Sequence, residues 1–560
     1  MKKESWKKVL SILLIAFVTL AMTPLLMTSV KGATDEEMEA SGAAAVVHLA
    51  SLQNPDGSWG SWDEVATTGL VLLKFLARAQ ELSKARPPPP VDPFDNNPLS
   101  PTYYEYADNV IAGFDYLLNN AYEVSISLQT HGDPDTNGNG KGIVFGTGFD
   151  VYNTGIALTA LAISGHPDDR SAVIGTLGLL TYGEIAQDVA DWLYFAQGDS
   201  GNARGGFNYD ALDNSGWRTD NSNGGYAYLG LAFAEDPPFN CIVPDWVRDE
   251  LNIYIDWIQN DVDGDTNDGG SGYSDPEGSV NILKTGNLIF EMAFYGDTPD
   301  TPRVQDAVDY LERHWRDPNW WPGWGYSLPV ADYQAKFLVE KGLSYMGIEL
   351  IDTDGDGEAD DNWFNQEPPA SPPLDFASVI VQQQLPSGGW PRTQWDNEPN
   401  AILSTAWAVL TLERFHPPPQ FIPVHVDVKP ASWPNPVQLK DRGVLPVAIC
   451  GTEEFDVTTI DPETIQLTLE GLGVGVAPLR WSYEDVATPY EGEPCSGHDL
   501  DGDGYLDLTL KFKAQEVTQT LGLDAFSDGD VVILILTGNL MEEFDGTPIR
   551  GQDCIVIRHK

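Results

Sequence analysis

Gln53-Asn54-Pro55-Asp56-Gly57-Ser58-Trp59-Gly60 is the stretch that decides the fold, because degenerate versions of it return five more times before residue 400. The later copies are the glycine and aromatic turns at residues 142–146, 205–207, 270–273, 323–326 and 388–390. Each turn follows one helical pattern and precedes a second, more apolar one. A turn that recurs between helical patterns indicates an array of helical hairpins. Six copies predict six hairpins.

Two classes of helix are expected around these turns. The outer, amphipathic segments precede the turns and cover residues 38–52, 108–118, 188–195, 246–258, 304–315 and 376–384. The inner segments follow the turns, are apolar and small on most faces, and cover residues 65–73, 153–163, 225–233, 282–294, 333–346 and 401–415. A helix that is apolar nearly all round is buried among other helices. Since an open solenoid needs polar end caps, which the pattern lacks, we predict a closed double ring, an α/α toroid, over residues 33–416.

The pattern changes after the proline-rich linker at residues 417–423. Apolar residues then alternate with polar ones in short segments at residues 424–428, 443–449, 465–469, 506–512 and 531–536. Short alternating segments separated by turn signals predict a β-sandwich of immunoglobulin-like size over residues 424–560. The fold class is therefore multidomain, α then β, as a chain of 560 residues allows.

The first 32 residues resemble a secretory signal peptide, with a lysine-rich start and an apolar run. The alternative is an uncleaved anchor, because the apolar run extends to Val30 and is long enough to span a bilayer despite Pro24. Either reading places the rest of the chain outside the cell, secreted or at the cell surface. We expect no membrane span after removal of the leader, and the oligomeric state cannot be deduced.

The net charge of −53 excludes nucleic acid as a partner and attracts cations. An acidic, well-solvated surface is the simpler explanation of the same composition. The four cysteines are too few for a disulfide scaffold. One disulfide is compatible with the three that lie near the C-terminus, Cys450, Cys495 and Cys554.

The sharpest metal-binding pattern is Asp499-Leu500-Asp501-Gly502-Asp503-Gly504-Tyr505-Leu506-Asp507. Carboxylates at positions 1, 3, 5 and 9, a glycine at position 6 and the carbonyl of Tyr505 at position 7 suit Ca²⁺, which requires many oxygen ligands. Position 12 is Leu510 rather than the glutamate of an EF-hand loop. The alternative is a charged β-turn without metal, although carboxylates this close repel each other unless they are neutralised.

Three loops between the helical segments carry related patterns. The clearest contains Asp352, Asp354, Asp356, Glu358 and Asp360, and looser versions contain Asp261, Asp263 and Asp265, and Asp133, Asp135 and Asn137. We predict structural Ca²⁺ that orders these loops. Solvated acidic loops are the alternative.

The turn at residues 53–60, the turn at residues 383–390 and the helical segment Ser404-Thr405-Ala406-Trp407-Ala408-Val409-Leu410 resemble the prenyltransferase and squalene oxidase repeats of the terpenoid cyclase and protein prenyltransferase superfamily of α/α toroids. The resemblance covers about residues 36–416 and implies the scaffold. It does not extend to the chemistry, since the chain has no DxDD motif near an inner segment, no zinc ligand set and no thioester motif. The C-terminal region resembles a β module found in many secreted microbial proteins. No activity follows from either resemblance.

Aromatic residues gather around the turns, which should meet at one end of a toroid. Trp59, Trp324 and Trp390 belong to the repeat motif and are expected to fill the gaps between hairpins. Others lie beside the motif and are candidates for stacking on a ligand. The predicted ligand-binding residues are Trp62, Tyr152, Trp217, Asp220, Trp321, Trp395 and Asp396.

Carboxylates also stand at the starts of the inner segments, among them Asp63, Asp220, Asp332, Asp396 and Glu398. A pair of them across the bowl would suit glycoside chemistry. Helix capping is the favoured alternative for each one. No catalytic residue is assigned, and enzymatic activity stays an open question.

These observations predict a secreted, calcium-stabilised cell-surface or matrix protein whose toroid binds a glycan, peptide or lipid ligand without catalysis. The alternative is an extracellular polysaccharide hydrolase or lyase, or a divergent isoprenoid cyclase or transferase, that uses the toroid bowl. Two carboxylates across an aromatic bowl would favour hydrolysis of a glycan. A deep apolar cavity that holds one acid would favour isoprenoid chemistry.

Overall fold

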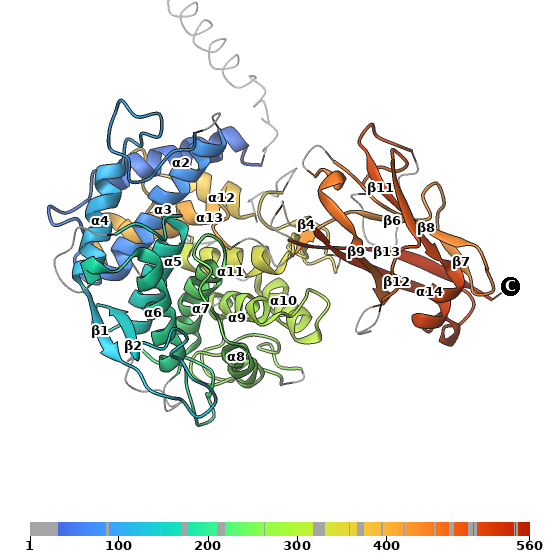
Figure 1. Cartoon of the computed structure of the whole chain (residues 1–560), viewed down its shortest axis with the longest axis horizontal. Coiled ribbons are helices and arrows are strands. Elements are labelled where there is room, and N and C mark those ends of the chain that lie inside the picture. Colours follow the sequence, from blue (N-terminus) through green and yellow to red (C-terminus); the bar gives the residue numbers. More distant parts are fainter. Residues whose placement is uncertain are drawn as a thin grey trace, which may run out of the picture.

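The structure is a computed structural model in which the helices precede the strand-rich region along the chain (Figure 1). It describes residues 32–85, 89–146, 148–170, 177–209, 219–262, 264–316, 331–357, 359–366, 375–393, 396–417, 421–452, 455–469, 475–490, 497, 501–541, 544 and 547–559. Twelve α-helices lie in the described residues before 417, and most strands follow them. The order of α then β expected from the sequence is confirmed. No described helix is both long enough and apolar enough to cross a bilayer.

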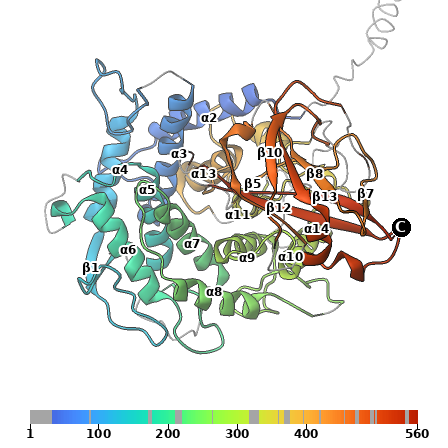
Figure 2. The same ribbon diagram turned by 45° about the vertical axis from the view of Figure 1, so that its right-hand side comes forward.

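The twelve helices alternate between the two expected classes. The outer helices bury one face each: α2 (Asp35–Ala50), α4 (Ala107–Asn119), α6 (Tyr182–Ala196), α8 (Asp245–Ile258), α10 (Pro302–His314) and α12 (Phe376–Gln383). The inner helices are buried along most of their length: α3 (Glu64–Lys84), α5 (Asp150–Ile163), α7 (Asn221–Glu235), α9 (Ile282–Tyr295), α11 (Tyr333–Met346) and α13 (Ile402–Leu412). In Figures 1 and 2, α4, α6 and α8 lie outside α5, α7 and α9.

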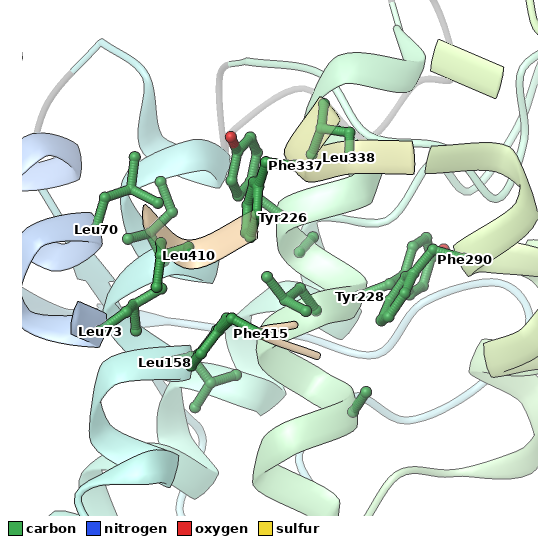
Figure 3. Packing of buried hydrophobic residues seen from close by; sticks show 14 of the residues in the cluster. Leu70, Leu73, Leu158, Tyr226, Tyr228, Phe290, Phe337, Leu338, Leu410 and Phe415 are labelled. Carbon is green, nitrogen blue, oxygen red and sulfur yellow. The ribbon is translucent and has the colours of Figure 1, made fainter. Parts of the chain in front are cut away.

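The inner helices contact one another in a closed cycle. Each contacts the next in chain order from α3 to α13, and α13 contacts α3. We call these six helices the inner ring. Leu73, Leu158 and Leu410 show how its members meet in one core, since they come from α3, α5 and α13 (Figure 3).

Glycines allow two pairs of inner helices to approach closely. A Cβ atom on Gly155 of α5 would lie 2.5 Å from the carbonyl oxygen of Tyr226 on α7, and one on Gly342 of α11 would lie 2.4 Å from the carbonyl oxygen of Gly286 on α9. Such distances exclude any larger residue without movement of the backbone. The small residues that marked the inner segments in the sequence therefore set the spacing of the helices.

The turns are tied to the inner helices by a repeated hydrogen bond. In four hairpins a threonine hydroxyl on the inner helix accepts from a backbone amide of the turn: Thr68 from Trp59 at 2.9 Å, Thr154 from Phe145 at 3.1 Å, Thr285 from Ser271 at 3.0 Å and Thr405 from Trp390 at 3.2 Å. The indoles of Trp59 and Trp390 are buried and donate to carbonyls of their outer helices. A Cβ atom on Gly113 of α4 would lie 3.1 Å from the Trp59 ring, so this indole reaches the next hairpin, whereas Trp324 lies outside the described residues.

Contacts between the first and last hairpins close the cycle. The buried Glu398 carboxylate precedes α13 and accepts hydrogen bonds from the amides of Trp62 at 3.1 Å and Asp63 at 3.0 Å, where α3 begins. Between the outer helices, Gln384 at the C-terminal end of α12 donates to the carbonyl of Ser41 on α2. One carboxylate therefore satisfies amides that the start of a helix would otherwise leave free.

Two short strand pairs interrupt the helical region. β1 (Ala121–Ser125) pairs with β2 (Lys141–Phe145), and β3 (Leu350–Ile351) pairs with β4 (Asp361–Asn362), both antiparallel. The turn predicted at residues 142–146 is therefore largely strand β2, and β3 and β4 flank the predicted acidic loop; each strand is too short to show an alternating pattern. The second pair positions the acidic loop discussed below.

The strand-rich region contains two sheets that share one hydrophobic core. The four-stranded sheet has the order β10-β11-β8-β6, with β6 (Val426–Val428), β8 (Val444–Ile449), β10 (Arg480–Glu484) and β11 (Asp507–Lys513). The other has the order β5-β13-β12-β9 with β7 beside β13, and contains β5 (Ile422–Pro423), β7 (Pro436–Gln438), β9 (Ile460–Leu469), β12 (Val531–Leu540) and β13 (Pro548–Arg558). A short helix, α14 (Ala514–Thr520), follows β11. Cys554 of β13 is disulfide-bonded, Cys241 and Cys450 are free, and Cys495 lies outside the described residues.

Candidate functional site

A cavity of about 580 Å³ lies at the N-terminal ends of the inner helices. All six inner helices, or the residues directly before them, contribute to its lining. Its size is within the range of cavities that bind small molecules. The position follows from the hairpin repeat, because the described turns lead into the first turns of inner helices and place these helix starts at one end of the ring, where Tyr273 is the turn aromatic that lines the cavity.

A continuous series of aromatic rings forms one side of the cavity. We call this series the aromatic wall; it consists of Trp62, Phe149, Tyr209, Tyr152, Tyr226 and Trp407. Successive ring centroids lie 5.7, 5.7, 5.9 and 5.1 Å apart from Trp62 to Tyr226. The Trp407 indole then donates to the Tyr226 hydroxyl at 3.2 Å. Ring faces arranged in this way bind apolar groups and the flat faces of sugars or other rings.

A cluster of hydroxyl groups lies next to the wall. The hydroxyls of Tyr209 and Tyr273 are 2.8 Å apart, and that of Tyr209 is 3.3 Å from the hydroxyl of Ser222. The Ser222 hydroxyl in turn donates to Asp220, which caps α7 by accepting from the Ser222 amide at 2.9 Å. Burial raises the pKa of Asp220 above its ordinary value. The carboxylate thus supports the hydroxyl cluster from behind the lining.

Asp63 is the one carboxylate among the described residues that line the cavity. Burial raises its pKa to about 6, and the nearby charge of Glu398 adds to the shift, while the Ala66 amide and Asn153 oppose it. A carboxyl group with a pKa near 6 is able to donate a proton near neutral pH. The described lining also holds one amine, that of Lys284 on the first turn of α9.

The predicted ligand-binding residues fall into three groups. Trp62 and Tyr152 line the cavity. Asp220 and Asp396 are buried behind it at the starts of α7 and α13, where Asp396 accepts from the amide of Ser404 at 2.8 Å. Trp217, Trp321 and Trp395 lie outside the described residues.

Other lining residues were missed by the sequence analysis, namely Phe149, Tyr209, Tyr226, Lys284 and Trp407. Three of them, Tyr226, Lys284 and Trp407, lie within predicted inner segments. All residues of such a segment are expected to be buried, so the sequence does not distinguish those that line a cavity from those that pack in the core. Phe149 lies four residues before such a segment, and this was the available signal for it.

The remaining carboxylates at the starts of helices act largely as caps. Asp332 accepts from the amide of Ala335 at 3.1 Å at the start of α11, and Asp375 accepts from the amide of Ser378 at 2.7 Å at the start of α12. Burial raises the pKa of Asp332 to about 7. Across the described cavity lining, no second carboxylate faces Asp63.

The acidic loop before α12 brings three carboxylates together. One oxygen from each of Asp352, Asp354 and Asp361 lies within 4.8 Å of the others. The β3–β4 pairing places Asp361, rather than the predicted Asp360, in this group, where it accepts from the Thr353 amide at 3.0 Å. Oxygen ligands of this kind suit a hard cation such as Ca²⁺. Asp356 and Asp360 are exposed, and Glu358 lies outside the described residues.

The loop before β11 is organised around Asp507. This buried carboxylate accepts from the amides of Gly451 at 3.1 Å, Val486 at 2.7 Å and Ala487 at 3.0 Å. Asp501, Asp503 and Tyr505 are exposed, and Asp499 lies outside the described residues. Asp507 therefore has a structural role as an acceptor for backbone amides, whether or not a cation binds beside it.

The two looser acidic patterns differ in how they are held. In one, Asp135 accepts from the amides of Asn139 at 3.0 Å and Gly140 at 2.8 Å, and Asn137 donates to Asp188 of α6 at 2.7 Å. Asp133 lies at the start of this loop. In the other, Asp261 and Asp265 are exposed and Asp263 lies outside the described residues. The first loop is thus fixed to an outer helix by protein groups.

Neither a search of family models nor one of curated proteins found a match for this chain. The geometry alone therefore describes this chain: it is a protein with a cyclic helical core and an aromatic cavity at the N-terminal ends of the inner helices.

Proposed function

We propose that this chain is a secreted, calcium-stabilised cell-surface or matrix protein, and that its helical region is an α/α toroid of the terpenoid cyclase type which binds a ligand without catalysis. The cavity with its aromatic wall is the observation that carries this proposal. The closed cycle of contacts in the inner ring supports the toroid, and the two sheets with a common core support an immunoglobulin-like sandwich. The convergence of Asp352, Asp354 and Asp361 supports calcium.

The ligand is a glycan, peptide or lipid with an apolar or ring-shaped face. The lining offers many ring faces but few charged groups, so stacking and apolar contact supply most of the affinity. Trp62 is 64% exposed at the edge of the cavity and is the wall residue that an entering ligand meets first.

Binding of the full chain to glycan, lipid and peptide arrays tests this proposal. We expect Trp62→Ala to weaken binding of the selected ligand about 3- to 10-fold, as the loss of one aromatic contact predicts. The matched control is Trp481→Ala, because Trp481 is also exposed, at 41%, but belongs to β10 in the other region. Absence of binding on all arrays, or equal weakening by both substitutions, would refute it.

Isoprenoid chemistry is the second candidate, and Asp63 is the specific observation in its favour. An acid with a pKa raised to about 6 in a cavity of mostly aromatic and aliphatic residues is suited to protonate an alkene or an epoxide. Incubation with squalene, its epoxide and shorter polyprenyl substrates would detect turnover. Products formed by the unmodified chain but not by Asp63→Asn would establish this candidate in place of non-catalytic binding. A polysaccharide hydrolase or lyase has less support, because the described lining holds one carboxylate rather than two.

A further inference from the structure

Lys284 differs from the other buried lysines in the helical region. Lys74 pairs with Glu413, Lys341 donates to the carbonyl of Gly225 at 2.5 Å, and Lys336 is fully enclosed by its neighbours. The side chain of Lys284 is 7% exposed and lines the cavity. Among the described residues, its Nζ has no hydrogen-bond partner and no salt-bridge partner.

The surroundings of Lys284 disfavour a positive charge. It is the third residue of α9, where the free amides of the first helical turn repel a cation. Its Nζ lies 4.8 Å from the centre of the Tyr273 ring, which is a weaker substitute for water or a carboxylate. Burial lowers the pKa of Lys284 from 10.5 to about 8, although the charges of Asp220 and Asp332 oppose the shift. Near pH 7 this gives roughly 300 times more neutral amine than an ordinary lysine has.

Groups that transfer protons lie on the same side of the cavity. Tyr273, over which the amine lies, is hydrogen-bonded to Tyr209, and the contacts continue through Ser222 to Asp220. Addition of an amine to a carbonyl group needs such groups, because the oxygen must gain protons before it leaves as water. A buried, neutral amine in an apolar cavity is the form in which lysine acts as a nucleophile.

We propose that Lys284 forms a reversible imine with an aldehyde or ketone whose apolar or aromatic body is bound by the aromatic wall. The lone pair of Nζ attacks the carbonyl carbon and gives a carbinolamine. Loss of the oxygen as water, with one proton from the amine and one from the hydroxyl cluster, leaves a carbon–nitrogen double bond. The iminium nitrogen then gives its proton back to the hydroxyl cluster, which leaves the neutral imine. Addition of water to the imine reverses the reaction. This inference rests on the proposed function, since the cavity must bind the ligand before the bond forms.

The test uses the full chain, 2-naphthaldehyde and sodium cyanoborohydride, which reduces an imine to a stable amine. Peptide mapping by mass spectrometry then measures the labelling of every lysine. We expect Lys284 to be labelled at least about tenfold faster than exposed lysines such as Lys141 and Lys513, since its neutral fraction is larger. The corresponding alcohol, 2-naphthylmethanol, has the same body without the carbonyl group and should suppress labelling of Lys284 only.

Two further lysines show whether fast labelling requires a place in the cavity or only a lowered pKa. Burial lowers the pKa of Lys336 and of Lys341 to about 7, but neither lines the cavity. We expect both to stay unlabelled. Labelling of Lys284 at the rate of Lys141, or labelling of Lys336 and Lys341 as fast as Lys284, overturns the proposal.

The variant Lys284→Met separates this proposal from the proposed function. We expect it to form no adduct in the cavity, while binding of 2-naphthylmethanol to the unmodified chain, measured by quenching of tryptophan fluorescence, reports the binding function separately. If the unmodified chain binds the alcohol but Lys284 is not labelled, the imine is excluded and the binding function stands. If the chain binds neither the alcohol nor the aldehyde, both proposals fail for aromatic ligands. If the variant does not fold, the unmodified chain is sufficient for the test: the alcohol must suppress the labelling of Lys284, and labelling that the alcohol does not suppress excludes an imine in the cavity.

Discussion

The helical region and the strand-rich region differ in how they bury charge. In the described part of the strand-rich region, Asp427 and Asp507 are the buried charged residues, and the core between the sheets is apolar. The inner ring instead encloses lysines and acids on several helices, among them Lys284, Lys336, Lys341, Glu291 and Glu340. Burial of an ionisable group is unfavourable unless it is paired or changes its protonation state. The ring therefore retains ionisable groups that a purely apolar core would lack.

The partners of these groups sharpen the contrast. Both oxygens of Asp507 accept from backbone amides, whereas neither oxygen of Glu291 has a hydrogen-bond partner among the described residues. Burial raises the pKa of Glu291 well above its ordinary value. A carboxylate with amide partners stabilises a loop, while one without partners is held neutral by its surroundings. Four substitutions test this difference, in order of decreasing expected effect.

Removal of the Glu398 carboxylate should have the largest effect. Glu398→Ala leaves the partly buried amides at Trp62 and Asp63 without an acceptor, and we expect a loss of about 3 kcal/mol in the free energy of unfolding. Urea denaturation followed by helical circular dichroism measures the loss. Glu398→Gln keeps one acceptor oxygen and should lose about half as much. A change below about 1 kcal/mol for the alanine variant would show that Glu398 does not hold the first and last hairpins together.

Asp507→Ala is the corresponding change in the strand-rich region. It removes the acceptor of three backbone amides, and we expect a loss of about 2 kcal/mol in the stability of this region. Near-ultraviolet circular dichroism during urea denaturation follows the change. Asp503→Ala is the control, because Asp503 is exposed in the same loop. Equal losses in both variants would contradict the structural role of Asp507.

The stability of the inner ring should change with pH in a way that depends on Glu340. Burial raises the pKa of Glu340 to about 8, so the folded chain keeps a proton that the unfolded chain releases. This contribution to the free energy of unfolding decreases as the pH rises, and between about pH 5 and 7 we expect it to fall by at least about 1 kcal/mol. Lys341, whose pKa burial lowers to about 7, contributes in the opposite direction above that pH, which is why the comparison stops there.

Thermal melts of the unmodified chain and Glu340→Gln at pH 5 and pH 7 measure the effect. The glutamine variant should lose less stability between the two pH values than the unmodified chain does. Glu39→Gln serves as the control, because its side chain is 74% exposed. The same pH dependence in all three proteins would show that Glu340 does not titrate as its burial implies.

Calcium should have the smallest effect. We expect millimolar Ca²⁺ to raise the melting temperature of the unmodified chain by a few degrees, which corresponds to about 1 kcal/mol of binding free energy. Asp354→Ala should reduce the rise, since Asp354 belongs to the converging carboxylates. Asp356→Ala changes an exposed neighbour outside that group and should retain it. A chain whose melting temperature does not respond to Ca²⁺ would leave the carboxylates as a solvated loop.

Part of the fold was predictable because local patterns encode it. The periodicity and burial of the inner segments located α3 and α13, and the alternating segments located β8 and β12. The strands β1 to β4 were not expected, since two to five residues between longer loops carry no clear period. The site was predictable only where a residue lay beside a turn, as Trp62 and Tyr152 do.

The rest of the site depends on contacts between distant parts of the chain. Lys284 and Trp407 look like ordinary inner-helix residues, and Asp360 and Asp361 are equivalent in an acidic loop until β3 pairs with β4. Each of these distinctions requires knowledge of which helices or strands lie side by side. Sequence spacing within one segment does not contain that information.

The sequence by itself determined the two kinds of helix and the change to strands after residue 417, because helix and strand periodicities are local properties. The tertiary structure alone decided that the starts of six helices surround one cavity, that Glu398 reaches the amides of Trp62 and Asp63, and that Lys284 lines this cavity. The reason is that closure of the ring brings together residues more than 300 positions apart, and their burial and pKa values follow from that encounter.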